Sequence, residues 1–171
     1  MNKRVSSRGI IIKGDYVYAM FRRRITEDGA VKDYYVIPGG GIDENESLEE
    51  NVIREIKEEF LVDVKIIGYL CFDENEDAIS HFFSCEIVSG EPKLGGEELE
   101  RCCESNYYEI KKVEISKLDE INILSKDIIL KAYNKEYIEI KNQWKVCKKK
   151  SCVNICVHIS ILSPKWLKTH S

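Results

Sequence analysis

The stretch Gly39–Val62, GGGIDENESLEENVIREIKEEFLV, contains the pattern of a capped amphipathic helix. Ser47 is a residue type that caps helix N-termini, and Glu50, three positions later, completes a capping box. Apolar residues then recur at every fourth position, and they are Leu48, Val52, Ile56 and Phe60. This spacing is typical of a helix with one buried side, so the sequence predicts a helix that begins after Ser47.

Three glutamates converge on another side of the predicted helix. Glu55, Glu58 and Glu59 stand at positions i, i+3 and i+4, which places their Cβ atoms within roughly 5–6 Å of one another. Like charges that close repel, and Arg54 supplies only one positive charge. A hard divalent cation would supply more, and carboxylate oxygens are ligands that Mg²⁺ and Mn²⁺ prefer. Spacing alone is more typical of a solvated acidic face, so the flanking residues decide between the two interpretations.

Three glycines precede the predicted helix. Pro38 ends the strand before them, and we expect Gly39, Gly40 and Gly41 to form a flexible loop. A backbone without side chains can approach phosphate groups closely. A glycine loop that leads into a carboxylate helix therefore indicates a phosphate-bearing ligand that a metal ion bridges to the protein.

The same residues resemble a known family motif. Gly40, five residues, Glu46, seven residues and then Arg54-Glu55-Ile56-Lys57-Glu58-Glu59 are similar to the Nudix box. The preceding segment Tyr34–Gly41, YYVIPGGG, resembles the strand and loop that lead into the box in many bacterial Nudix hydrolases. The resemblance extends over most of the chain and stops short of its C-terminal part.

One position departs from the motif. Leu61 occupies the place of the box glycine, just before the apolar Val62. That glycine normally ends the helix in a left-handed conformation, where a residue with a Cβ atom costs about 1 kcal/mol. We expect the departure to affect the helix exit and not the metal ligands.

The resemblance implies an α/β fold, the Nudix α/β/α sandwich with a mixed β-sheet. It also implies a Mg²⁺-dependent hydrolase, with Mn²⁺ as a substitute, that cleaves a phosphoanhydride bond in a nucleoside diphosphate derivative or a nucleoside triphosphate. On this basis Glu55, Glu58 and Glu59 would hold the metal ion. Arg54 would orient these glutamates, and Glu46 would support the loop and the start of the helix.

The general base is left open by the resemblance. In some family members the residue at the position of Glu59 is the general base, and in others a glutamate from a later loop is the base. We expect Gly95-Gly96-Glu97-Glu98 to form a mobile acidic loop, so Glu98 is the first choice for the later role and Glu100 the second. A solvated acidic loop without a catalytic role is the alternative.

Arginines and tyrosines near the glycines are candidates for substrate contacts. A guanidinium binds phosphate through two parallel hydrogen bonds. The resemblance implies that Arg22 and Arg23 face the nucleotide, and a solvated strand end is the alternative. Tyr34 and Tyr35 alternate in direction, so one is expected in the core while the other is free to stack on a base.

The remaining segments alternate between strand and turn patterns. Strands are expected over residues 8–13, 16–21, 34–37, 63–72, 79–88 and 107–115, with a polar loop at 26–33 and a bulge at Gly68. A final helix is expected from residue 126 to about residue 137, capped by Ser125.

Charge divides the chain into two parts. We expect a Nudix domain over residues 1–137 and a basic C-terminal extension over residues 138–171. Residues 136–171 carry a net charge of +5, and the 135 residues before them carry −9. An acidic body argues against non-specific nucleic-acid binding and suits a site that gathers divalent cations.

Cysteine content and hydropathy indicate the compartment and the partners. Seven cysteines without a CxxC pair indicate free thiols in a reducing environment. No apolar run approaches the ~20 residues of a membrane helix. We therefore expect a cytoplasmic protein that binds a small-molecule nucleotide, with neither a membrane nor a nucleic acid as partner. The resemblance leaves a homodimer open.

Two other classes of function stay open. The first is a Nudix domain that senses a nucleotide without cleaving it, although every glutamate of the box is present. The second is an RNA-end pyrophosphohydrolase that uses the lysines of the basic extension to bind phosphates.

Overall fold

A computed structural model describes residues 3–139 of the 171-residue chain. These residues belong to one compact unit, Met1–Lys141. Apart from Ile138 and Glu139, the expected basic extension at residues 138–171 lies outside the described residues, and so do its lysines.

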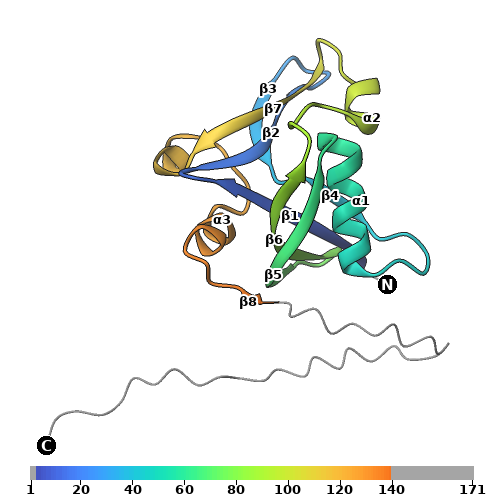
Figure 1. Ribbon diagram of the computed structural model, residues 1–171. Coiled ribbons are helices and arrows are strands. Elements are labelled where there is room, and N and C mark those ends of the chain that lie inside the picture. The colour runs from blue at the N-terminus through green and yellow to red at the C-terminus, as the bar shows by residue number, and fades with distance from the viewer. Residues whose placement is uncertain (1–2, 140–171) are drawn as a thin grey trace, which may run out of the picture. The chain divides into compact units, whose positions relative to one another are not determined.

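A mixed β-sheet forms the centre of the unit (Figure 1). Its strands are β1 (Arg4–Lys13), β2 (Tyr16–Ile25), β3 (Val31–Val36), β4 (Gly39–Gly41), β5 (Asp63–Glu74), β6 (Ala78–Ser89), β7 (Asn106–Glu114) and β8 (Ile138–Glu139). The order is β3-β2-β1-β6-β5-β8, with β4 paired to β1 and β7 paired to β2. Only the β1–β6 pair is parallel among the described strands.

Helices cover both faces of this sheet. They are α1 (Leu48–Phe60), the short α2 (Gly96–Glu100), the 3₁₀ segment η1 (Ile115–Glu120) and α3 (Lys126–Tyr133). Because successive strand residues point to opposite faces, adjacent apolar residues enter different cores. Ile11 and Phe83 pack with α1, while Ile10 and Phe82 pack with η1 and α3. The expected α/β/α sandwich with a mixed sheet is therefore confirmed.

Helix α1 begins and packs as its sequence predicts. The Ser47 hydroxyl accepts a hydrogen bond from the Glu50 amide at 3.1 Å, and the Glu50 carboxylate accepts one from the Ser47 amide at 2.9 Å. Three members of the predicted apolar stripe are fully buried, and they are Val52, Ile56 and Phe60. This packing turns the glutamates away from the apolar core, with the Glu58 side chain 54% exposed and the Glu55 side chain 15% exposed.

The exit of α1 keeps a left-handed residue although it is not glycine. Leu61 has φ 54° and ψ 31°, and its amide donates a hydrogen bond to the Lys57 carbonyl at 3.1 Å. Its side chain is 49% exposed and lies against Gly95. The exit turn therefore has the conformation that the box glycine would adopt, with a Cβ atom in a disfavoured region of backbone space.

Replacing Leu61 by glycine should stabilise the protein. We expect Leu61→Gly to raise the free energy of unfolding by about 0.5–1 kcal/mol, because it removes the left-handed Cβ strain at the cost of a partly exposed contact. Urea denaturation of the full-length chain measures the change. Leu61→Ala is the matched control, since it loses the same contact and keeps the strain. Equal stabilisation by both variants, or destabilisation by Leu61→Gly, would contradict this explanation.

The expected flexible glycine loop is a strand, so that prediction was wrong. Gly39–Gly41 forms β4 and pairs with Ser6–Arg8 of β1. At Gly39 φ is +138°, and an added Cβ would lie 2.1 Å from the Ser7 carbonyl oxygen. At Gly40 an added Cβ would lie 2.5 Å from a carboxylate oxygen of Glu55. The glycines therefore allow a close approach between β1, β4 and α1.

Three other local predictions need correction. Part of the expected polar loop at 26–33 is strand, because β3 already begins at Val31. The expected acidic loop that contains Glu98 forms the short helix α2. The final helix ends at Tyr133, before Lys135 with φ +59°, and Ser125 stands at its N-cap in a left-handed conformation without a capping bond. The expected irregularity at Gly68 is confirmed by a register shift in the β5–β6 pair.

Candidate active site

A cleft of about 650 Å³ lies beside α1, and most of the predicted site residues line it. Those residues are Arg22, Gly39, Gly40, Gly41, Arg54, Glu55, Glu58, Glu59 and Glu98. Glu46 lies behind Arg54, and neither Arg23 nor Glu100 belongs to the lining. The fold therefore brings together segments that are far apart in the sequence.

Arg54 connects the carboxylates of the cleft. Its guanidinium forms two parallel hydrogen bonds with the Glu46 carboxylate, at 2.8 and 3.0 Å. Its third nitrogen donates to Glu55 at 3.0 Å and to Glu58 at 3.2 Å. One guanidinium thus holds three carboxylates, and the hydrogen bonds to Arg54 lower the pKa of Glu46 to about 2. Charge-assisted bidentate pairs of this kind fix the geometry of both partners.

Asn51 is a buried member of the same network that sequence reasoning missed. Its amide nitrogen donates to the Gly41 carbonyl at 2.7 Å and to Glu46 at 3.0 Å. Its oxygen accepts a hydrogen bond from the Ser7 amide at 3.2 Å. Asn51 therefore ties α1 to β1, β4 and Glu46. A buried polar residue inside an otherwise apolar helix face is the signal that points to it.

Burial and mutual repulsion act on the two inner glutamates. Burial is the main cause that raises the pKa of Glu59 to about 8, and the charges of Glu98 and Glu55 raise it further. The Gly39 amide donates to Glu59 at 2.9 Å and partly opposes this shift. Burial also raises the pKa of Glu55, against the effect of Arg54. A positive charge in the cleft would stabilise the ionised forms of Glu55 and Glu59.

Gly95 and the following helix bring a fourth glutamate to the cleft. The Gly95 amide donates to the Glu59 carbonyl at 2.9 Å, and an added Cβ at Gly95 would lie 2.5 Å from the Glu58 carbonyl oxygen. This close contact sets α2 on the end of α1. Glu98 consequently lines the cleft, near enough to raise the pKa of both Glu55 and Glu59.

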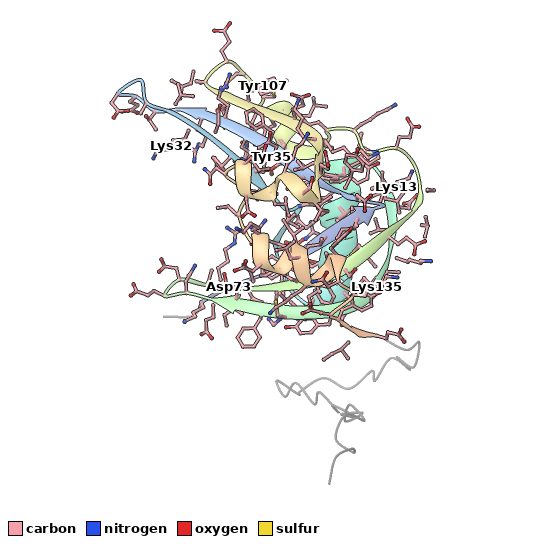
Figure 2. All side chains as sticks on the ribbon, turned by 90° about the vertical axis from the view of Figure 1, so that its left-hand side faces the viewer. Lys13, Lys32, Tyr35, Asp73, Tyr107 and Lys135 are labelled. Atoms are coloured by element: carbon pink, nitrogen blue, oxygen red, sulfur yellow. The ribbon has the colours of Figure 1, made fainter. Side chains whose placement is uncertain are left out.

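The two arginines predicted to contact substrate lie on opposite faces of β2. Arg22 lines the cleft, whereas Arg23 forms a two-point ion pair with Asp33, at 2.8 and 2.6 Å, on the other face. The tyrosines of β3 divide in the same way. Tyr35 packs against the core cluster on the η1 and α3 side of the sheet, the side that faces the viewer in Figure 2. The Tyr34 ring lies 5.8 Å from the Arg22 guanidinium carbon.

Other lining residues were not found from the sequence. They are Arg4, Arg8, Met20, Val36, Ile37, Ile42, Asp43, Gly96, Glu97 and Arg101. Arg4 and Arg8 reach the cleft because β1 pairs with β4. This pairing is long-range, so no local sequence pattern predicts it. Their spacing of four in a strand, on one face, is the only sequence signal they carry.

The donor set fits a hard divalent cation. Glu55, Glu58 and Glu59 offer carboxylate oxygens from one helix, and the cleft raises the pKa of Glu55 and Glu59 through burial and repulsion. Within residues 3–139, no three histidine, cysteine, aspartate or glutamate side chains are already gathered at metal-binding distances. Because Arg54 bonds to Glu55 and Glu58, binding a cation there requires these side chains to turn from the guanidinium.

Comparison with family models shows which family the chain belongs to. The model described as the NUDIX domain matches residues 3–129. The chain therefore belongs to the NUDIX family, and it is an enzyme of the pyrophosphohydrolase class.

Solved structures share the fold at low sequence identity. A MutT NUDIX hydrolase from Burkholderia pseudomallei is 21% identical, with a TM-score of 0.59 over 77% of this chain and 98% of its own. An ADP-ribose pyrophosphatase from Streptococcus suis is 17% identical, with a TM-score of 0.56 over 81% and 96%. A NUDIX hydrolase from Nitrosomonas europaea is 12% identical, with a TM-score of 0.60 over 81% and 93%. Comparison with curated proteins found no match.

Among residues 3–139, no helix combines the length and apolar character needed to cross a membrane.

The raised pKa of Glu59 predicts a pH-dependent stability. Between the unfolded pKa near 4.5 and the folded value of about 8, the folded protein binds more protons than the unfolded chain, so stability falls as pH rises. In chelator, wild type should lose about 4 kcal/mol of unfolding free energy relative to Glu59→Gln between pH 5 and 8.5. Urea denaturation across this range measures the difference, with the exposed Glu91→Gln as control. Parallel profiles for wild type and Glu59→Gln would contradict the burial argument.

Proposed function

We propose that this protein is a Mg²⁺-dependent hydrolase, able to use Mn²⁺ instead, that cleaves a phosphoanhydride bond in a nucleoside diphosphate derivative or a nucleoside triphosphate. The observation that carries the proposal is the placement of Glu55, Glu58, Glu59 and Glu98 around one cleft that the glycine strand β4 also lines. These carboxylates repel one another, and a polyanionic substrate would approach them only together with cations. The match of residues 3–129 to the family model supports the same class of reaction.

Each part of the cleft has a role in this proposal. When bound, Mg²⁺ would neutralise phosphate oxygens and lower the pKa of the attacking water. Glu55, Glu58 and Glu59 would hold the ion, with Arg54 positioning Glu55 and Glu58 and the Gly39 amide positioning Glu59. Glu46 fixes Arg54 through the two-point contact. The close-packed glycines of β4 leave their backbone open to the phosphates.

Glu98 is the better of the two candidates for the general base. A base must accept the proton of the water as its oxygen attacks phosphorus and the bridging P–O bond breaks. One oxygen of Glu59 already accepts a hydrogen bond from the Gly39 amide, and its carboxyl is deeply buried. Glu98 lies on α2 at the edge of the cleft, and has no hydrogen-bond donor at its carboxylate among the described residues.

A hydrolysis screen tests the proposed reaction. Purified full-length protein should hydrolyse at least one member of a panel of nucleoside triphosphates and nucleoside diphosphate derivatives with Mg²⁺ or Mn²⁺, and chelator should abolish turnover. Glu58→Gln should lower kcat by about 100-fold or more, because it removes a charged ligand of the ion. Full activity in Glu58→Gln would contradict the assigned role. Tight nucleotide binding without turnover on the whole panel would indicate a sensor instead.

The pH profile separates Glu98 from Glu59 as base. Glu98→Gln should lower kcat by about 100-fold or more and remove the acidic limb of the kcat profile, while Mn²⁺ affinity changes little. Glu100→Gln, a neighbour outside the cleft lining, is the matched control and should retain activity. An acidic limb that persists in Glu98→Gln would assign the proton transfer to another group.

A further inference from the structure

An apolar contact joins the end of α1 to the segment that leads into α2, which lies beside it (Figure 1). The Leu61 side chain lies against Gly95, where an added Cβ would lie 2.6 Å from Leu61 Cδ2 and 2.8 Å from Leu61 Cγ. Gly95 is the N-cap of α2, and Glu98 follows it by three residues. The side chain that stands in place of the box glycine therefore touches the segment that carries the candidate base.

Helix α2 has few contacts of its own to hold it in place. None of the residues Gly96–Glu100 is buried, and the N-cap Gly95 makes no side-chain capping bond. A helix of five residues is too short to be stable without support from the rest of the protein. The ion pair between Arg101 and Glu97, at 2.7 Å, joins two exposed side chains and contributes little. The position of α2 therefore depends on how its first residues are held at the end of α1.

Backbone hydrogen bonds bring this segment to the end of α1. The Lys93 amide donates to the Phe60 carbonyl at 3.0 Å, and the Gly95 amide donates to the Glu59 carbonyl at 2.9 Å. Beyond these bonds the chain passes through Gly96, whose φ is +62°. Glycine backbone has more conformational freedom than that of other residues. A side chain that packs on Gly95 consequently restrains a direction that the hydrogen bonds leave free.

Leu61 makes this contact from a disfavoured backbone conformation. Its φ of 54° and ψ of 31° are left-handed, and its side chain is 49% exposed. A half-exposed leucine gains less from burial than a leucine in the core, so stability does not explain the residue. Residues in such sparsely populated conformations cluster at functional sites. The outlier therefore points to a function for the side chain.

We infer that Leu61 is a positioning residue, whose side chain holds Gly95 and α2 against the end of α1 and so keeps Glu98 at the cleft. The inference rests on the proposed function, with Glu98 as its general base. It deepens that function by giving a role to the residue that departs from the family motif. Without the side chain Glu98 would shift from the attacking water, and a misplacement of about 1 Å can cost roughly 100-fold in rate.

Substitutions at Leu61 test this role with the best substrate of the hydrolysis screen. Leu61→Gly and Leu61→Ala should each lower kcat by about 10-fold, because both lose the contact with Gly95. KM should change by less than about 2-fold, since β4 and the glutamates of α1 stay in place. Leu61→Met keeps an apolar side chain of similar volume and should retain kcat within about 3-fold. Leu124→Ala, at a leucine that is 51% exposed and outside the cleft lining, is the matched control and should retain activity.

Two readouts separate positioning from a merely structural role. Leu61→Gly should be slower than wild type although it is more stable, because it loses the left-handed strain together with the contact. In the Glu98→Gln background, Leu61→Ala should lower kcat by less than about 2-fold, since both residues act through one carboxylate. Wild-type kcat in Leu61→Gly, or a full 10-fold loss from Leu61→Ala on top of Glu98→Gln, would overturn the inference.

Hydrogen exchange tests the contact without any substrate. The Gly95 amide bonds to α1, and the Leu99 and Arg101 amides bond within the α2 turn. These amides should exchange about 10-fold faster in Leu61→Gly and Leu61→Ala than in wild type and Leu61→Met. Absence of all hydrolysis by wild type would remove the proposed function, and this measurement would then decide alone on Leu61. Equal exchange in all four proteins would overturn its positioning role.

Discussion

The two-point contact between Arg54 and Glu46 is the interaction on which the site depends. Glu46 accepts two hydrogen bonds from Arg54, and the remaining nitrogen of that guanidinium reaches Glu55 and Glu58. Without this positive charge, carboxylates on one helix face would repel one another at full strength. Asn51 supports the contact from the buried side by donating to Glu46. When a cation arrives, Glu55 and Glu58 turn from Arg54 toward the ion, while the two-point contact with Glu46 holds the guanidinium in place.

Close packing at glycine positions determines where that network lies. Gly40 leaves room for the Glu55 carboxylate, and Gly95 leaves room for the end of α1. As a result β4 and α2 both approach the helix closely. Glu98 joins the glutamates of α1 at the cleft, although two long strands, β5 and β6, separate it from them in the sequence. The site therefore depends on the absence of a side chain at Gly40 and Gly95, because only then can β4 and α2 approach α1 closely.

The sequence predicted the features that local patterns specify. The capping box, the buried stripe of α1 and the convergence of Glu55, Glu58 and Glu59 follow from helical spacing, and all of these appear. Features set by long-range pairing were missed. Gly39–Gly41 was predicted to be a loop because no local rule shows that β1 pairs with these residues. Arg8 was not predicted as a site residue for the same reason. Arg23 was grouped with Arg22 because adjacency in sequence hides the alternation of a strand.

The most direct test of this account is the Mn²⁺ affinity of Glu46→Gln. Glu46 is outside the set assigned to the ion, so a loss of affinity would come from the release of Arg54 and not from a lost ligand. Titration followed by electron paramagnetic resonance should show about 10-fold or more weaker Mn²⁺ binding than wild type. Glu50→Gln, at the capping box, controls for changes at the helix start. Unchanged Mn²⁺ affinity in Glu46→Gln would contradict the claim that the Arg54–Glu46 contact organises the site.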